Sequence, residues 1–575
     1  MRFLRRFAAL AVAITLIAIS WLWWNRPQKV DMAAYVPADS LVYLEANSLP
    51  EIARGIVETE AWQALAPPAG IKAGFGQVGW LSRVIAWTGV GPTDAVVLSR
   101  AQLAVTVLGF EATEAGDILK IKPRAALVAE THTGEARTWS AVEKRVGDFA
   151  LRAYGRPSVE RTELDGIRFI TWSSPSAERR IVAAVKGSVA VVGNDEAAVR
   201  ACLAVRRGER PSLVGNGQVE EMRRRLNSLE ARAFGYISPT GAARIFEIAA
   251  MAYAGQIATD PRAQSAAASL LPQLTSKILG SIGWSSRFAE NGVEDRYFIS
   301  LQNDLAIRLR DALALSAGTS LRASEMLPGE TYSISNYNQR DPEAAWRGLN
   351  AVVSSQLDTF GAIFISRFFE SALEPYGIEE PAGFMRVIGS EVVTARLDEA
   401  GVITVVIFEV RDEEALRKLV SKRLGANPRI ERVGDSEMLI SKNEERGAAS
   451  FVAGRLLMGT AAAVRRCLEA RAQGRTLSVA EPFRRAAHAA SLNGPANVVT
   501  YTKDDTQART FISSIASLPG VSDQPLNEDA MKHVLDGLNY AVSETRLVEG
   551  GFERKTRSSF GQFGTLVAQF STEEQ

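Results

Sequence analysis

The chain has 575 residues, of which 46% are hydrophobic and 23% are charged. This length exceeds what one hydrophobic core usually supports, and the composition is that of a folded globular protein, which excludes a disordered or fibrous chain. Sixty-six basic residues against 65 acidic ones leave a net charge of +1, so the composition gives no electrostatic attraction toward nucleic acid. We therefore expect several folded units and no nucleic-acid partner.

The chain opens with basic residues, followed by an uncharged run over residues 7–24. A helix over this run reaches roughly 27 Å, enough for a bilayer core. Tryptophans close the run, where indoles favour the membrane interface, and the basic start predicts a cytoplasmic N-terminus. The predicted anchor residues are Arg2, Arg5, Arg6, Trp21, Trp23 and Trp24.

This pattern predicts an inner-membrane protein with a single pass, in contact with the lipid bilayer through residues 7–24, and with the bulk of the chain periplasmic. A cleaved signal peptide is the alternative, because Ala18-Ile19-Ser20 is an acceptable cleavage site. Three tryptophans directly after that site favour an uncleaved signal anchor.

After a short linker over residues 28–35, a strand is expected over residues 40–46 and a helix from Ser48 to about Leu65. Ser48 is a capping residue, with proline in the first turn and Glu51 three positions on. A second strand and helix follow the same order near residue 327, where Asp341 takes the capping position. This parallel is the first indication of an internal repeat.

Hairpins also recur at matching places. Apolar strands surround Lys186-Gly187 and Gly454-Arg455, where glycine provides the positive φ of a tight turn. Asn194 and Thr460 are then expected to cap two helices. Each half ends in a strand, a glycine-containing turn and a return strand, over residues 283–294 and 539–553.

The two capped helices carry the only two cysteines, in Val199-Arg200-Ala201-Cys202-Leu203 and Val464-Arg465-Arg466-Cys467-Leu468. In each, valine, cysteine and leucine lie at i, i+3 and i+4, which is one buried helical face. Cysteine behaves there as a small hydrophobe, so we expect two buried free thiols and no disulfide. Self-similarity over so long a period indicates a duplicated domain.

The predicted fold class is α+β: an N-terminal transmembrane helix followed by two tandem similar units, each an antiparallel sheet with helices on one face. The expected division is residues 1–27 for the basic tip and anchor, 28–35 for a linker, 36–305 for copy one, 306–326 for a connecting segment and 327–575 for copy two.

The opening Val36-Pro37-Ala38-Asp39-Ser40-Leu41-Val42-Tyr43-Leu44-Glu45, the single-span start and the closing Asn-Gly hairpin resemble a domain-of-unknown-function family of bacterial single-span exported envelope proteins. The resemblance implies a place in the bacterial envelope. It implies no established activity and no functional residues.

Motifs for chemistry are sparse. His132, His488 and His533 are the three histidines, and no zinc-binding spacing occurs, so we expect neither a metal nor another cofactor. Residues 74–79 match Gly-x-Gly-x-x-Gly but follow Pro67-Pro68, which is not the strand that a dinucleotide site needs. Arg223-Arg224-Arg225 lies among glutamates and is interpreted as a solvated helix face.

These observations favour a non-catalytic binding or scaffolding role, with an envelope protein as a possible partner. Two alternatives stay open. A carrier of a lipid or other apolar ligand predicts an apolar pocket between the helices and the sheets or between the copies. An envelope hydrolase with an unrecognised site predicts that His132 lies in a cleft with acidic and hydroxyl residues.

Overall fold

The computed structural model describes residues 29–71, 101–115, 118–257, 272–289, 292–302, 304–316, 321–357, 380–425, 427–517, 521–522 and 524–570. The predicted anchor residues and the glycine motif at residues 74–79 lie outside these ranges. Among the described residues, no helix has the length and apolar character needed to cross a bilayer. The predicted transmembrane helix is therefore not among the helices of the described fold.

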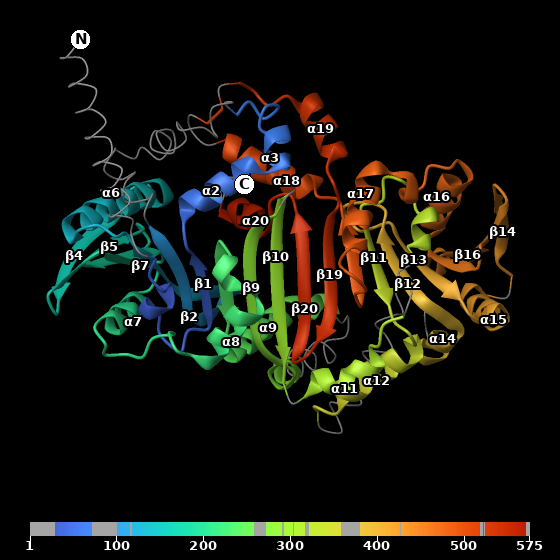
Figure 1. Cartoon of the computed structure of the whole chain (residues 1–575), viewed down its shortest axis with the longest axis horizontal. Coiled ribbons are helices and arrows are strands. Elements are labelled where there is room, and N and C mark those ends of the chain that lie inside the picture. The colour runs from blue at the N-terminus through green and yellow to red at the C-terminus, as the bar shows by residue number, and fades with distance from the viewer. Residues whose placement is uncertain are drawn as a thin grey trace, which may run out of the picture.

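Antiparallel strands from the first half form one side of the molecule (Figure 1). They are β1 (Val42–Ala46), β2 (Gln102–Ala115), β3 (Ile118–Glu130), β4 (Ser158–Leu164), β5 (Ile167–Ser173), β6 (Arg180–Lys186), β7 (Val189–Gly193), β8 (Ala233–Ile237), β9 (Leu279–Ala289) and β10 (Gly292–Leu301). Their order across the sheet is β4-β5-β6-β7-β3-β2-β1-β8-β9-β10.

The second half repeats this order strand by strand. Its strands are β11 (Ser333–Asn338), β12 (Ile388–Arg396), β13 (Thr404–Val410), β14 (Arg429–Val433), β15 (Ser436–Ile440), β16 (Ala448–Val452), β17 (Arg455–Gly459), β18 (Val498–Thr502), β19 (Ala541–Val548) and β20 (Gly551–Ser558). Their order is β14-β15-β16-β17-β13-β12-β11-β18-β19-β20. One pairing pattern therefore occurs twice in the described chain.

The prediction of two separate sheets is wrong. β10 pairs with β20 in antiparallel register from Val293↔Ser558 to Ser300↔Gly551, so the described strands form one 20-stranded sheet. The last strand of each half meets its counterpart, and this places an approximate two-fold axis between β10 and β20. Each half ends on a free edge whose backbone groups need a partner, and pairing the two edges satisfies both.

Because Ile299 faces Phe552 in this register, Ile299→Cys with Phe552→Cys should form a disulfide on mild oxidation. Facing Cα atoms lie roughly 4.5–5.5 Å apart, within the range that a disulfide spans. Ile299→Cys with Glu553→Cys is the control, since neighbouring residues point to opposite faces. The disulfide is detected by alkylating each variant in denaturant and counting its free thiols by mass spectrometry. Equal thiol counts in the two variants would contradict the pairing.

Helices cover both faces of the outer strands, so the prediction of helices on one face is also wrong. In the first half, α7 packs on Val182 and Val191 while α6 packs on Ala183, the next residue along the strand. α16 and α15 take the same two faces in the second half. Strand residues alternate between faces, so a strand buried on both sides needs two helical layers. We call the face under α7, α8, α16 and α17 the cysteine face.

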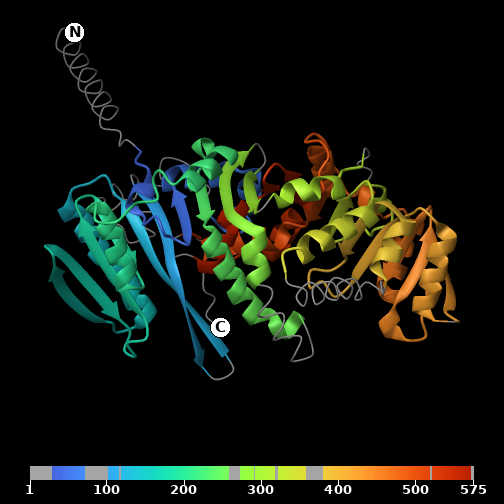
Figure 2. The ribbon, with the colours of Figure 1, turned by 90° about the horizontal axis from the view of Figure 1, so that it is seen from below.

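The helices of the first half are α2 (Leu49–Glu58), α3 (Glu60–Leu65), α6 (Glu135–Tyr154), α7 (Glu196–Arg206), α8 (Gly217–Arg225) and α9 (Pro239–Ile257), with the 3-10 turns η1 (Met32–Tyr35) and η3 (Ser228–Glu230). Those that follow are α11 (Leu305–Ala312), α12 (Pro342–Ser354), α14 (Pro381–Val387), α15 (Glu413–Leu424), α16 (Ala461–Ala472), α17 (Glu481–Ser491), α18 (Asp505–Ala516), α19 (Glu528–Gly537) and α20 (Gly561–Phe570), with η4 (Arg322–Glu325), η6 (Glu444–Arg446) and η7 (Leu477–Val479). Figure 2 shows the helical layers on the two faces of the sheet and the β2–β3 ribbon that extends past the sheet.

The cysteine prediction is confirmed. Cys202 on α7 and Cys467 on α16 are buried free thiols in equivalent places of the two halves. Burial raises the pKa of each thiol to about 12. The thiolate, which is the reactive form, is therefore suppressed, and both side chains act as packing groups.

Three of the four predicted helix caps are confirmed. Ser48, Asp341 and Thr460 cap α2, α12 and α16 as expected. Asn194 does not cap α7. Asp195 takes that role, and the Asn194 side chain instead bonds to the backbone of β3. The helix expected from Ser48 to Leu65 is two helices, because Thr59 ends α2 and caps α3.

Candidate functional site: a cationic groove at the joint of the two halves

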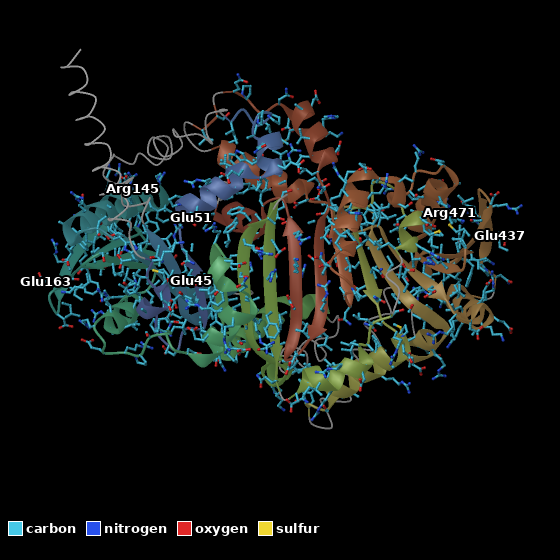
Figure 3. All side chains as sticks on the ribbon, in the orientation of Figure 1. Glu45, Glu51, Arg145, Glu163, Glu437 and Arg471 are labelled. Carbon is cyan, nitrogen blue, oxygen red and sulfur yellow. The ribbon has the colours of Figure 1, made fainter. Side chains whose placement is uncertain are left out.

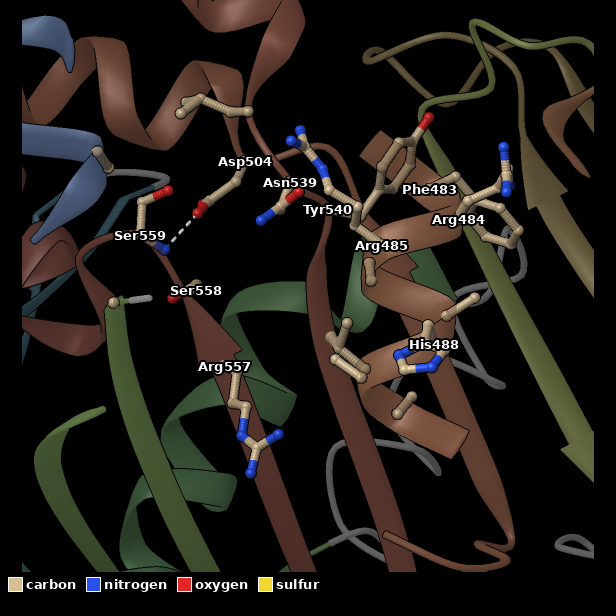
Figure 4. Close-up of a pocket in the computed structure, with 18 of the residues that line it drawn as sticks. Phe483, Arg484, Arg485, His488, Asp504, Asn539, Tyr540, Arg557, Ser558 and Ser559 are labelled. Carbon is tan, nitrogen blue, oxygen red and sulfur yellow. Dashed lines mark hydrogen bonds between the residues drawn. The ribbon is translucent and has the colours of Figure 1, made fainter. Parts of the chain in front are cut away.

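A groove with a cavity volume of about 1330 Å³ lies where the two halves meet. Strands β9, β10, β20 and β19 form its floor, on the cysteine face. α17 forms one wall, while α3 and α19 stand at one end (Figures 1 and 4). The groove exists only because β10 and β20 pair, since each half supplies two of the four floor strands.

Four basic side chains surround one carboxylate on the floor. Glu294, whose side chain is 1% exposed, accepts hydrogen bonds from Nε of Arg287 and Arg296, both at 2.9 Å. Lys555 Nζ and Arg557 Nε each lie 3.1 Å from the other carboxylate oxygen. The strands explain the arrangement: Glu294 faces Arg287 on β9 and Arg557 on β20, and the two remaining bases lie one row along the same face.

The pKa of Glu294 shows the strength of this positive field. Burial alone would raise that pKa, but hydrogen bonds from Arg296 and Lys555, attraction to Lys555 and the bond from Arg287 lower it to about 2. The carboxylate is therefore ionised at any ordinary pH. Among the described residues, Arg296, Lys555 and Arg557 have no other carboxylate within 4.0 Å.

The four bases around Glu294 thus exceed its single negative charge, and two of them reach solvent. Glu544 on β19 is a second buried carboxylate on the floor, and Arg546 lies 3.4 Å from it. The side chains of Arg287 and Arg557 are 37% and 41% exposed, and both line the groove. Guanidinium groups present donors in a fork that matches phosphate and carboxylate oxygens. The geometry suits a ligand with an acidic group.

The wall and the far end of the groove add further polar groups. Arg485 on α17 donates to the Gly537 carbonyl at 2.9 Å, and His488 lies on the same helix (Figure 4). His533 on α19 also lines the groove. Two of the three histidines, distant in sequence, therefore line the same groove.

At the end of β18, Asp504 is buried and accepts a 2.5 Å hydrogen bond from the Ser559 backbone N–H. Burial raises the pKa of Asp504 to about 6, against the effect of that hydrogen bond. Asn539 lies nearby, with its amide pointing into the same space (Figure 4).

The raised pKa of Asp504 gives a stability prediction. Its ordinary pKa is 3.8, so between about pH 4 and 6 the folded chain holds a proton that the unfolded chain releases. The free energy of unfolding should fall as pH rises through this window, by roughly 3 kcal/mol. Asp504→Asn should remove this slope, measured by urea unfolding at several pH values. Asp529→Asn, at an exposed position on α19, is the control, and an unchanged slope in Asp504→Asn would contradict the assignment.

His132 only partly meets the condition set for a catalytic site. Its Nε2 lies 3.0 Å from Gln102 Oε1, and its backbone N–H donates to Glu130, which also accepts from Tyr35. Acidic and hydroxyl neighbours are thus present. His132 does not line the groove, and Gln102 uses its amide to hold the Val30 backbone through two hydrogen bonds. The cluster fastens the start of the described chain to β2 and β3.

The interpretation of Arg223-Arg224-Arg225 as a solvated face needs correction at its first residue. Arg224 is 75% exposed, but Arg223 is only 16% exposed and bonds to Asp31 and to the buried Glu45. Glu45 is labelled on the first half in Figure 3. Arg223 joins α8 to β1 and to the segment before η1. Its role is in packing the first half.

Comparison with known proteins identifies no family. No family model matches the chain, and no curated protein matches it. A solved structure titled "Structure of crystal form IV of TP0453" is similar over 50% of this chain and 86% of that one, with 12% identity and a TM-score of 0.23. A score this low carries no argument about fold or function.

The predicted anchor residues lie outside the described ranges. None of the described residues that line the groove was predicted from the sequence as part of a site. The signal that could have found it is the alternation Glu294-Asp295-Arg296 and Lys555-Thr556-Arg557. Charges two residues apart on a strand share one face, and such a face is unusual in the middle of a large sheet.

Proposed function

We propose that this chain is a non-catalytic binding protein whose central groove holds an acidic ligand. The observation that carries the proposal is the set of four bases around Glu294, two of which extend into a groove large enough for a ligand. Glu294 balances only part of the charge of these four bases, since the second buried carboxylate of the floor, Glu544, is paired with Arg546. An incoming anion would balance more of that charge.

Inorganic pyrophosphate is a suitable probe. Calorimetric titration of the full chain should give saturable binding at one site, weaker in 300 mM than in 50 mM salt, since exposed charges are screened. Glucose, which is neutral, is the control and should give no heat. Absence of pyrophosphate binding at low salt would refute the proposal.

An apolar ligand remains a prediction, with less support from this groove. The groove lies between the halves, where that alternative placed a pocket, but Arg287, Glu294, Lys555 and Arg557 place charges across the middle of its floor. A place in the bacterial envelope is likewise proposed from the resemblance of residues 36–45, and fractionation of cells that express the tagged chain would test it.

A further inference from the structure

We infer that a second copy of this chain pairs with strand β4, at the outer end of the first half. This inference is independent of the groove and goes beyond the proposed function. Among the described residues, β4 pairs only with β5, so its other edge has backbone groups that can pair with another chain. All seven residues of β4 are exposed, and Figure 3 shows Glu163 of this strand at the outer end of the molecule.

The turn after β4 determines which of its backbone groups are free. A two-residue turn, in which both residues have positive φ, joins the facing residues Leu164 and Ile167. Residues that flank such a turn exchange both backbone hydrogen bonds, and hydrogen-bonded positions then alternate along an antiparallel pair. Leu164 and Thr162 therefore bond to β5, whereas Arg161 and Glu163 direct their N–H and C=O groups to the free edge.

The charges of β4 select one register for pairing with a second copy. Two identical antiparallel strands related by a two-fold axis have one residue that faces itself on the axis. Glu160, Arg161 or Glu163 on the axis would bring like charges together, which is unfavourable. Thr162 on the axis instead places Arg161 opposite Glu163 of the second copy, and does so twice. Since both residues have free backbone groups, this register also pairs the two edges through hydrogen bonds.

The side chains of this register are available for the contact. Arg161 is 64% exposed and donates to Glu143 on α6 at 2.7 Å, which holds its guanidinium on the α6 face of β4. Glu163 lies on the same face, because residues two apart on a strand share a face. Among the described residues, Glu163 has no basic side chain within 4.0 Å. Arg161 of the second copy would supply one.

Strand β14, the free edge of the second half, offers no comparable register. Arg429, Glu431 or Arg432 on the axis would again bring like charges together. Ile430 on the axis would place Arg432 opposite Pro428, which has no N–H to donate. Charges and proline are the usual protection of an edge strand, and β14 has both. We therefore assign the contact between copies to β4 alone.

The expected assembly is a closed, reversible dimer. Strand addition gains affinity mainly from main-chain hydrogen bonds, and an interface of one strand pair is small. Association should therefore depend on protein concentration. Pairing of β4 with β14 of the next copy would instead be heterologous and would produce open chains of molecules.

The first test is Thr162→Cys in the full chain. Facing residues of an antiparallel pair lie roughly 4.5–5.5 Å apart, within the reach of a disulfide. The two native cysteines are buried, so they do not compete. Mild oxidation should convert the variant to a covalent dimer on a non-reducing gel. Glu431→Cys, which lies equally far from the turn on β14, is the matched control and should give no covalent dimer.

The second test reverses the charges, with sedimentation velocity over a range of concentrations as the measurement. Arg161→Glu should weaken dimerisation by about tenfold, because two glutamates then face each other at both ends of the contact. Adding Glu163→Arg to the same chain should restore the dimer to within about threefold. Circular dichroism verifies that each variant is folded.

The inference would be overturned by a full chain that stays monomeric at every concentration, or by equal disulfide formation in Thr162→Cys and Glu431→Cys. Dimerisation that Arg161→Glu does not weaken, or that the double reversal does not restore, would overturn the register. Species larger than a dimer would show pairing of β4 with β14 and would contradict the closed assembly.

Discussion

Glu294→Gln should lower the free energy of unfolding by roughly 2–4 kcal/mol at pH 7. The substitution keeps the shape of the side chain but leaves four basic groups around a neutral amide, and removing one partner of a buried ion pair is costly. Because the pKa of Glu294 is about 2, its contribution is fully present above about pH 4.5 and is lost as pH falls toward 2. The difference in free energy of unfolding between Glu294→Gln and the unmodified chain should therefore become smaller at acidic pH.

Urea unfolding followed by circular dichroism measures this difference. Glu431→Gln is a matched control, because Arg465 and Arg429 also lower the pKa of Glu431 to about 2, but at the edge of the sheet, where the pair reaches solvent. Its loss of stability should be clearly smaller. Pyrophosphate should stabilise Glu294→Gln more than the unmodified chain, since an anion can replace the missing carboxylate. If the two substitutions lowered the free energy of unfolding equally, the charges on the floor would be no more than a solvent-exposed network of ion pairs.

The double substitution Arg287→Gln with Arg557→Gln should weaken pyrophosphate binding by about 30-fold. Each exposed guanidinium contributes about 1 kcal/mol to holding an anion, after allowance for solvent screening, and 1.4 kcal/mol corresponds to tenfold in affinity. Arg296 and Lys555 still hold Glu294, so the variant should remain folded.

The control for this variant is Arg429→Gln, on the edge strand β14 and far along the sheet from the groove. It removes the same charge and should leave the affinity within twofold. Thermal unfolding verifies that all variants are folded before titration. If the double variant bound pyrophosphate as well as the control, the groove would not be the anion site.

The sequence predicted local structure better than assembly. The caps at Ser48 and Thr460 and the burial of Cys202 and Cys467 depend on neighbours within one turn of helix, and these predictions are confirmed. The pairing of Val293 with Ser558 depends on residues that are far apart in the chain. Periodicity shows that each segment is a strand but does not show which strand lies beside it.

The groove was missed for the same reason. Glu294 and Lys555 each read as ordinary charges on hairpin strands, and only the pairing of β10 with β20 brings them to 3.1 Å. The two halves of the sequence carry no repeated catalytic motif. A groove formed by both halves together does not require one.

The most direct test of the account is anomalous scattering from tungstate, a tetrahedral anion similar to phosphate, in crystals of the full chain. The account predicts a tungsten peak in the groove, within hydrogen-bond reach of Arg287, Lys555 or Arg557, that disappears in the Arg287→Gln, Arg557→Gln variant. Peaks confined to other surfaces, or a groove peak that persists in the variant, would contradict it.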